Sequence, residues 1–344
     1  MKTFLSTCLS RCASLLPAAA IIAAALHGGP WPLVALIVMT LWVWGMDKTG
    51  LPGLSDGVMK DALPVVVGLA HFATLAAVLW SLRSGWQGLE TLATMLAAGL
   101  FFGQISNACA HELIHRPQRH LRWLGTAIYC SLLNGQHVSA HLLVHHVWAG
   151  TARDPNSAPK GRGFYRFFWT GMVREFLAGR AAECARRTDG TRRWHPYTFY
   201  ILGAIATLCA AGLMAGLAGL IGLLALALHA QSQLFLSDYV QHYGLRRTTL
   251  KNGKPEPMGL RHSWNAPGRY SDAMLLAAPR HSDHHANPGK AYHSLQLDRD
   301  AMPMLPASLP VMSTIALIPP LWRRIMDPRV DAVTRKTDVA VQAA

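Results

Sequence analysis

The stretch LETLATMLAAGLFFGQISNACAHELIH, which runs from Leu89 to His115, decides the fold because a long apolar run leads directly into paired histidines. Its first part, Leu89–Ala110, carries no charge after Glu90 and has the length of about 20 residues that a bilayer-spanning helix needs. Residues four apart share one face of a helix, so His111 and His115 project together. The stretch therefore predicts a membrane helix that ends in a pair of histidines.

The composition of the whole chain agrees with a membrane protein. Of its 344 residues, 51% are hydrophobic and only 15% are charged, whereas soluble domains carry roughly 25% charged residues. This apolar content excludes a disordered chain, and six cysteines in 344 residues exclude a disulfide-stapled domain. No two cysteines form a CxxC pair, so the chain has no rubredoxin-like or iron–sulfur module of its own.

We predict an all-α integral membrane protein with about six transmembrane helices and a cytoplasmic helical cap that carries the histidines. The predicted spans are approximately 15–26, 31–46, 64–82, 89–110, 197–214 and 217–236. The first two are interpreted as a helical hairpin that turns at residues 27–30, and a signal peptide is the alternative for the first of them. A further apolar stretch, 304–322, contains four prolines and is predicted to be interfacial or buried rather than spanning.

Positive charge in the short loops sets the expected orientation. With the N-terminus inside, the loops left outside expose a single basic residue, Arg83. This topology divides the chain into four regions: four N-terminal spans in 1–110, a cytoplasmic histidine-rich region in 111–196, a transmembrane hairpin in 197–236, and a second cytoplasmic histidine-rich region in 237–344.

Histidines gather at four places just beyond the predicted cytoplasmic ends of the spans. They are His111 and His115; His141, His145 and His146; His242; and His281, His284 and His285. On regular helices we expect His145 to join His141 and the adjacent His146 to point about 100° away, where it would serve a second metal. We expect the last three histidines to share one face. Nine imidazoles exceed what one four-coordinate zinc uses and suit two metal ions, although imidazole by itself does not fix the metal.

Carboxylates near these histidines are few. Glu112, Asp154 and Asp238 are interpreted as groups that orient a histidine ring by accepting a hydrogen bond from its other nitrogen. A solvated or helix-capping charge is the alternative for each. His71 and His229 lie within predicted spans, where we expect packing residues that form hydrogen bonds between helices.

Four motifs carry a resemblance to a known family: HELxH at His111–His115, HxxxHH at His141–His146, HYGL at His242–Leu245, and RHSDHHANP at Arg280–Pro288. The chain resembles the integral-membrane alkane monooxygenases, which include alkane 1-monooxygenase and the hydroxylase of xylene monooxygenase. These enzymes belong to the wider membrane fatty-acid desaturase and hydroxylase superfamily. The sequence departs from the commonest pattern at Asp238 and Gln241, where the family usually has Asn and Glu, and this leaves the substrate open.

The resemblance implies that the nine histidines named above are iron ligands. It also implies six transmembrane helices, two non-haem iron ions, and an O2-dependent hydroxylation of a terminal C–H bond in an alkane or alkyl chain. His262 lies in a family-like HSWN segment and is the best candidate for a further residue that supports a ligand. The resemblance also implies that the protein crosses the bacterial inner membrane several times and that its metal site lies on the cytoplasmic side.

Two electrons must reach such a site from outside, because the chain has neither a cysteine cluster nor a dinucleotide-binding fingerprint. A rubredoxin or ferredoxin with its NAD(P)H-dependent reductase is the expected partner. The segment Arg153–Arg193 holds ten Lys and Arg against four Asp and Glu, which suits docking of an acidic electron carrier. Contact with anionic membrane lipid explains the same charge equally well. Nucleic acid is not an expected partner.

An alkane has no polar group, so its selection is expected to depend on the shape of an apolar channel between the spans. We interpret five aromatic residues as lining or plugging this channel: Trp42, Trp44, Phe72, Phe101 and Phe102. Interface anchoring or helix packing is the alternative for all five.

Other functions fit the histidines less well. The HExxH spacing of His111 and His115 also occurs in zinc metalloproteases, with Glu112 as general base, but a protease leaves the other three histidine clusters unexplained. A metal transporter would place its histidines within the spans. Desaturase boxes usually read HxxxH, HxxHH and HxxHH, whereas the middle box here is HxxxHH. Fatty-acyl desaturation and methyl-arene hydroxylation remain the alternatives to alkane hydroxylation.

Overall fold

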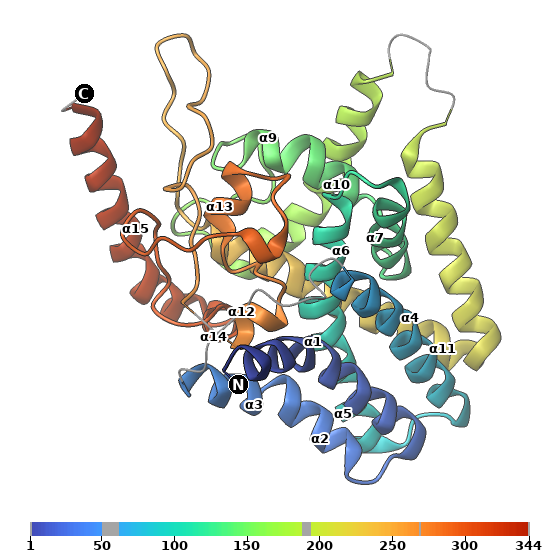
Figure 1. Cartoon of the computed structure of the whole chain (residues 1–344). Helices are drawn as coiled ribbons and strands as arrows, with labels where there is room; N and C mark the ends of the chain where they lie inside the picture. Colours follow the sequence, from blue (N-terminus) through green and yellow to red (C-terminus); the bar gives the residue numbers. More distant parts are fainter. Residues whose placement is uncertain (1, 50–61, 188–193, 268–269, 343–344) are drawn as a thin grey trace.

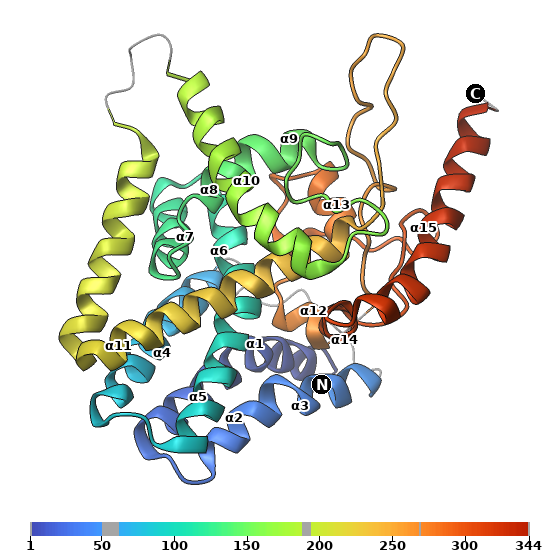
Figure 2. The same cartoon turned by 180° about the vertical axis from the view of Figure 1, so that it is seen from behind.

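The computed structural model describes residues 2–49, 62–187, 194–267 and 270–342. Within these ranges the regular elements are helices, and the only β-structure is two isolated bridges, Thr249 with Pro255 and Asn265 with Met304. The prediction of an all-α protein is confirmed. Figures 1 and 2 show α1 to α5 at one end of the molecule, while the short helices α9 and α13, the loops and the long helices α10 and α15 lie toward the other.

The N-terminal segment forms the expected helical hairpin. Helix α1 (Lys2–His27) turns at Gly28 and Gly29, whose φ angles of +62° and +59° favour glycine, and α2 (Trp31–Met39) packs back against it. The predicted second arm, 31–46, is interrupted at Thr40, where φ is −126° and ψ is −87°, and continues as α3 (Leu41–Lys48). The hairpin is therefore present, but its second arm is not one continuous helix.

The central helices are long and apolar. They are α4 (Leu63–Ser81), which runs into η1 (Leu82–Ser84), and the consecutive α5 (Gly88–Phe101), η2 (Phe102–Ser106) and α6 (Asn107–Ile114). Segment η2 is π-helical. Among the described residues, the helices long and apolar enough to cross a membrane are Leu63–Ser84, Gly88–Ile114 and Pro196–His242.

The longest of these, α11 (Pro196–His242), is two helices joined at a sharp bend. The backbone leaves the helical region at Ala215 and Gly216, and the φ of +57° at Gly216 requires a residue without a Cβ. This bend matches the predicted hairpin of 197–214 and 217–236. The three candidate helices cover four of the predicted ranges, since α11 contains both 197–214 and 217–236, and the number of spans stays a prediction. The ranges 15–26 and 31–46 are not among the candidates, because the apolar part of α1, Ala13–His27, is short and the second arm is interrupted.

The cap is formed by segments that precede α11 in the sequence and by segments that follow it. Its elements are α7 (Arg119–Ser131), α8 (His137–Ala140), η3 (His141–His145), α9 (His146–Trp148), α10 (Phe164–Ala185), α12 (Tyr270–Met274), α13 (His281–Ala286), η4 (Tyr292–Ser294), α14 (Leu309–Ala316) and α15 (Pro319–Gln342). In both views α13 lies beside α9, although more than a hundred residues separate them in the chain (Figures 1 and 2). The proline-containing stretch 304–322 forms α14 and the start of α15, and neither is among the helices long and apolar enough to span.

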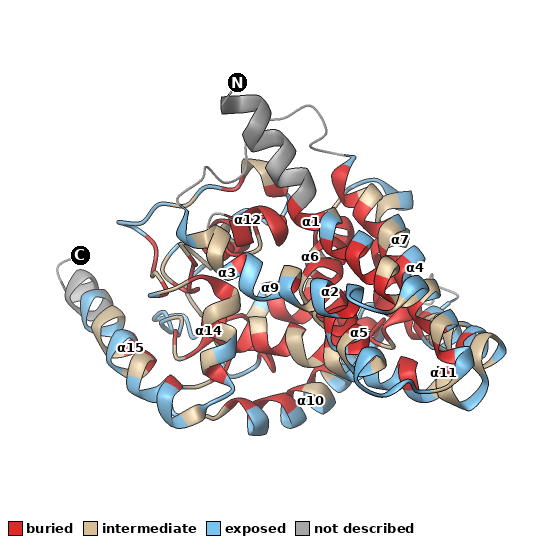
Figure 3. Ribbon diagram, turned by 90° about the horizontal axis from the view of Figure 1, so that it is seen from below, coloured by how far each residue is buried: buried red, intermediate tan, exposed pale blue. Residues whose placement is uncertain are grey.

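Burial is greatest where the long helices meet the cap. Figure 3 shows buried residues concentrated in the interior, while α10, α11 and α15 expose their outer faces. Trp264, Tyr243 and Phe235 are almost fully buried. Nε1 of Trp264 donates to the carbonyl of Tyr243 just after α11, and Phe235 packs against Phe167 and Phe168 of α10. Most of the histidine-bearing segments are therefore part of the cap, and they pack on the long helices beneath it.

Candidate metal centre

The nine predicted histidines come together in the interior as two groups. Within each group the ring nitrogens lie within 4.8 Å of one another. The five-histidine group is His111, His115, His141, His146 and His284, and the four-histidine group is His145, His242, His281 and His285. Every histidine of the four motifs belongs to one of the two groups, and the prediction that they ligate metal remains to be tested.

Within each group the Nε2 atoms point at one another. In the five-histidine group, the Nε2 of His146 lies 2.9 Å from that of His141 and 3.1 Å from that of His115. In the four-histidine group, the Nε2 of His281 lies 2.9 Å from that of His242 and 3.0 Å from that of His285. Two imidazole ligands about 2.1 Å from one ion and at right angles to each other place their nitrogens about 3 Å apart. The donor arrangement therefore fits a metal ion in each group.

A π-helical turn decides which histidine joins which group. Segment η3 (His141–His145) has i to i+5 hydrogen bonding, so each turn takes more residues than in an α-helix and residue i+5 returns toward the face of residue i. His141 and His146 accordingly share a group, while His145 turns to the other. The expectation that His145 joins His141 and that His146 stands apart was wrong, because it assumed an ordinary α-helix.

Helix α13 also serves both groups. His281 and His285, four residues apart, belong to the four-histidine group, whereas His284 contacts the five-histidine group through His146, with 3.2 Å between their Nε2 atoms. The expected common face for these three histidines was therefore wrong, since the helix lies between the two groups. His111 and His115 do share one group, as predicted.

Asp154 contacts a histidine in the way the sequence suggested. Its Oδ2 lies 2.9 Å from Nδ1 of His145 and also accepts a hydrogen bond from Ser157 at 2.6 Å. Burial lowers the pKa of His145, but the negative charge and hydrogen bond of Asp154 outweigh it and raise the pKa to about 9. The Nε2 of His145 has no hydrogen-bond partner among the described residues, so this nitrogen is directed into the four-histidine group.

The other group members outside the long apolar helices are held uncharged by burial. Removal from water lowers the pKa of His115 to about 4 and that of His281 to about 3. Burial likewise lowers the pKa values of His146 and His284 well below the ordinary value. A neutral imidazole keeps a lone pair, which is the form that coordinates metal.

Asp238 lies in a buried network that sequence reasoning missed. The Nδ2 of Asn156 donates to Asp238 at 2.7 Å and to Glu175 at 2.8 Å, and the other oxygen of Glu175 lies 3.0 Å from Nδ1 of His137. The His137 ring in turn lies 5.2 Å from that of His141. Asp238 thus contacts an asparagine, whereas the sequence led us to expect a histidine ring. The available signals were the position of His137 one helical turn before His141 and an isolated acid, Glu175, on the buried face of α10.

Two further expectations have different outcomes. Glu112 is buried, forms an ion pair with Arg116 at 2.7 Å and accepts from the backbone N–H of Tyr292 at 3.3 Å. Its expected role in orienting a histidine stays a prediction. His262 accepts from the backbone of Gly259 at 2.9 Å and its Nε2 lies 3.1 Å from Glu256. Both ring nitrogens are thus engaged within its own loop, and the structure does not support its expected contact with a ligand.

Asn265 instead supports the last histidine motif. Its side-chain amide donates to the hydroxyl of Ser282 at 2.7 Å, and its oxygen accepts from the backbone N–H of Ser282 at 2.9 Å. These bonds fix the first turn of α13, which carries His281 and His284. The HSWN segment is therefore important, but through Asn265.

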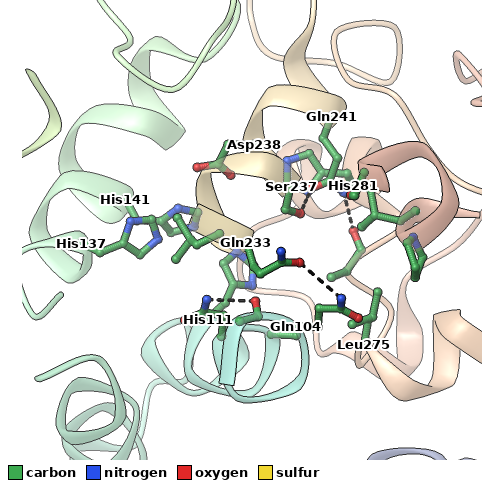
Figure 4. A pocket seen from close by; sticks show the side chains of 18 of the residues that line it. Gln104, His111, His137, His141, Gln233, Ser237, Asp238, Gln241, Leu275 and His281 are labelled. Atoms are coloured by element: carbon green, nitrogen blue, oxygen red, sulfur yellow. Dashed lines mark hydrogen bonds between the residues drawn. The ribbon is translucent and has the colours of Figure 1, made fainter. Parts of the chain in front are cut away.

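A cavity adjoins both histidine groups (Figure 4). His111 and His141 of the five-histidine group and His281 of the four-histidine group form part of its wall. The remaining lining residues come from η2 and α6, from α7 and α8, from the second arm of α11, and from 275–278 and α14; they are Gly103, Gln104, Asn107, Ala108, Tyr129, His137, Gln233, Leu234, Ser237, Asp238, Gln241, Leu275, Ala278, Leu309, Pro310 and Ser313.

The five aromatic residues expected in a channel do not line this cavity. Trp42 and Trp44 are 45% and 54% exposed on α3, while Phe101 and Phe102 are completely buried and pack on each other. Phe72 and Phe102 contact the ring of His71 from two sides. The channel role of these five residues stays a prediction, and their burial and contacts fit the alternatives of packing and surface anchoring.

Comparison with known proteins agrees with the site. The model of the fatty acid desaturase family matches residues 84–316, which include both histidine groups. Alkane 1-monooxygenase 1 of Pseudomonas aeruginosa is 32% identical over 78% of this chain and 71% of that protein. Alkane 1-monooxygenase 2 of Alcanivorax borkumensis is 29% identical over 87% of this chain and 81% of that protein. The chain therefore belongs to the fatty acid desaturase family, in which it groups with proteins named alkane 1-monooxygenase.

Proposed function

We propose that this chain is a membrane-bound, non-haem di-iron monooxygenase that hydroxylates a terminal C–H bond of an alkane or alkyl chain. The balanced reaction is R–H + O2 + 2 electrons + 2 protons to R–OH + H2O. The observation that carries the proposal is the convergence of nine histidines into two groups beside one cavity. The names of the relatives add the reaction class, since they are alkane 1-monooxygenases.

Iron is the proposed metal because breaking an unactivated C–H bond is beyond side-chain acid–base chemistry and needs a redox centre. The five-histidine group and the four-histidine group would each hold one ion. When bound, the two irons supply the activation of O2. Burial keeps rings such as His115 and His281 neutral, and Asp154 orients the ring of His145 through the hydrogen bond to Nδ1.

The cavity is the proposed substrate site. Leu275, Leu309 and Pro310 contribute apolar wall to the cavity, and they suit a hydrocarbon chain while limiting the entry of water. Because His111, His141 and His281 line the cavity, one end of a bound hydrocarbon would lie near both proposed metal positions.

The proposed topology has six spans, with the N-terminus and the cap in the cytoplasm of a bacterial cell and the spans in its inner membrane. Three apolar helices of sufficient length, one of them bent at Gly216, support the membrane location. The orientation rests on the loops around Arg83, which hold little positive charge. Labelling of single cysteines introduced at Ser84 and Arg299 from either side of the membrane tests it, and we expect opposite sides.

The electrons are proposed to come from a rubredoxin or ferredoxin and its NAD(P)H-dependent reductase. Arg166, Arg174 and Arg180 are exposed along α10, and they offer positive charge to an acidic carrier. Residues 188–193 of the basic segment lie outside the described part of the chain.

Metal and product analysis test the proposal together. The full chain purified in detergent is expected to hold about two irons, two being the number of histidine groups. Cells that also make a rubredoxin system are given n-alkanes, methyl-arenes and fatty acyl esters, and the products are identified. An alcohol from an n-alkane supports the proposal, whereas an alkene from an acyl chain or a benzylic alcohol alone replaces it with desaturation or methyl-arene hydroxylation.

A matched pair of variants tests the site within the same assay. His284→Ala removes a member of the five-histidine group and is expected to abolish turnover. His293→Ala removes a nearby histidine that belongs to neither group and contacts Ser294, and we expect it to keep turnover. Equal loss in both variants, or one zinc and no iron in the purified protein, contradicts the proposal.

A further inference from the structure

The cavity has a polar feature that a plain alkane does not use. Gln104 of η2 and Gln233 of α11 face each other in its wall, and Nε2 of Gln104 donates to Oε1 of Gln233 at 3.3 Å (Figure 4). The Oε1 of Gln104 is buried and has no hydrogen-bond partner among the described residues. An unsatisfied buried acceptor costs free energy, which a hydrocarbon in the cavity cannot recover.

The local backbone is built around this pair. Gln104 lies in the π-helical segment Phe102–Ser106, and such turns occur frequently at functional sites. A Cβ on Gly103 would lie 2.4 Å from Cβ of Gln233, so only glycine lets the two helices approach here. Asn107 then joins them, because its Nδ2 donates to the carbonyl of Gly103 at 2.9 Å and to that of Ala230 at 3.0 Å.

Amides are costly within membrane helices and are kept there for binding or for contacts between helices. Asn107 already bridges the two helices at this position. The contact between helices thus does not account for the acceptor that Gln104 leaves unpaired. A ligand group that donates a hydrogen bond does account for it.

We propose that the amide pair of Gln104 and Gln233 binds the hydroxyl group of an alkyl alcohol, whose far end is then hydroxylated. The hydroxyl donates to Oε1 of Gln104, and its oxygen accepts from Nε2 of Gln233. The inference rests on the proposed function and narrows its substrate class. The reaction is HO–(CH2)n–CH3 + O2 + 2 electrons + 2 protons to HO–(CH2)n–CH2OH + H2O, with the electrons from the external carrier named above.

The position of the pair also limits chain length. Gln104 precedes His111 by seven residues of continuous helix, which separates them by about 10 Å along the axis. An alcohol is thus held at one end by the amides and must reach the histidine groups with the other. Turnover of 1-alkanols is therefore expected to show a sharp optimum in chain length, whereas turnover of n-alkanes is expected to change gradually.

The test compares each 1-alkanol with the n-alkane of the same length, supplied together to membranes that contain the full chain and its electron carrier. The n-alkane carries an isotope label, so that the labelled alkanol formed from it is distinguished by mass from the unlabelled alkanol that was supplied. In the unchanged protein we expect the alkanol to be preferred near the optimum length. Gln104→Leu and Gln233→Leu are expected to lower the product ratio of diol to alkanol by about five- to tenfold, the value of about one hydrogen bond. Both variants should lose the length optimum for 1-alkanols.

Gln231→Leu is the matched control. Gln231 is buried in the same arm of α11, but its amide donates to the carbonyl of Leu132 and does not line the cavity. We expect this variant to keep the product ratio, because a loss of folded protein lowers both products equally. An unchanged ratio in Gln104→Leu and Gln233→Leu overturns the inference, even if n-alkanes are hydroxylated and the proposed function stands.

A binding measurement keeps the two proposals separable. The melting temperature of the purified, metal-free protein is recorded with 1-alkanol or n-alkane at equal concentration. A larger rise with the alkanol, absent in Gln104→Leu, supports the amide pair whether or not turnover is observed. Equal shifts for both ligands overturn it. If the unchanged protein hydroxylates neither substrate, the proposed function fails, and the melting data still decide on the amide pair.

Discussion

His71 and His145 are both buried histidines, yet the surroundings of the two rings differ in one decisive respect. His71 packs between Phe72 and Phe102, and its two nitrogens lie 2.9 and 2.8 Å from the hydroxyls of Ser106 and Ser131. His145 has Asp154 on one nitrogen and no hydrogen-bond partner on the other among the described residues. Both ring nitrogens of His71 have hydrogen-bond partners, whereas one ring nitrogen of His145 in the four-histidine group has none among the described residues. The number of satisfied ring nitrogens thus separates a packing histidine from a candidate ligand.

The largest effect is expected when a histidine is removed from the four-histidine group. His145→Ala is expected to lower the iron content from about two to about one per chain and turnover by at least about 100-fold, because loss of a ligand exceeds loss of its supporting group. Iron is measured by elemental analysis of the purified protein. Retention of both irons with full turnover would remove His145 from the metal centre.

A smaller effect is expected from the group that supports this ring. Asp154→Asn keeps the size of the side chain but removes the charge that holds Nδ1 of His145, and we expect metal affinity to fall by about 10- to 100-fold. Competition with a chelator measures the affinity. Asp331→Asn is the control, since Asp331 pairs with Lys160 at the exposed surface. Equal affinities in the two variants contradict the role of Asp154.

The pH dependence of stability in the metal-free protein distinguishes His145 from the other clustered histidines. The pKa values of His281 and His115 are lowered to about 3 and about 4 by burial, so the unfolded chain binds protons below about pH 6.5 that the folded chain does not. These residues reduce the free energy of unfolding as the pH falls below that value. The pKa of His145 is raised to about 9, so its contribution is present below about pH 6.5 and is lost between pH 6.5 and 9.

We therefore expect the melting temperature of the metal-free protein to be highest near pH 6.5 and to fall on both sides. Thermal denaturation in detergent between pH 4.5 and 9 measures it. A melting temperature that keeps rising as the pH falls from 6.5 to 5 would show that the clustered imidazoles are not buried as described.

The smallest effect on the metal centre is expected when His71, whose two ring nitrogens both have partners, is replaced. His71→Ala leaves a cavity and unpaired hydroxyls, and it should reduce the free energy of unfolding by about 2 kcal/mol while the iron content stays at about two. His27→Ala changes an exposed histidine at the end of α1 and should alter neither quantity. Loss of iron in His71→Ala would show that a satisfied histidine is also needed for metal binding, and the criterion drawn from the comparison would fail.

Local chemistry made much of this protein predictable. The long apolar helices at 63–84 and 88–114 follow from uncharged runs of sufficient length, and the bend at Gly216 follows from a glycine-containing link between two such runs. The clustering of the nine histidines was also predictable, since their spacing brings them together on helices and a neutral imidazole offers a nitrogen lone pair to a metal. The packing role of His71 was predicted and is confirmed.

What the tertiary structure alone decided is the pairing of those elements. The division of the histidines into five and four depends on the π-helical turn at His141–His145, where one residue more per turn moves His145 to the opposite group. The contacts of Asn156 with Glu175 and of Gln104 with Gln233 join residues far apart in the chain, and neither residue of a pair signals the other. The length of an apolar run and the presence of a metal-binding side chain can be read from a short segment. The direction in which a side chain points depends on the backbone conformation, which is set by tertiary packing. The sequence by itself therefore determined which residues meet at the centre, and packing decided what each of them faces.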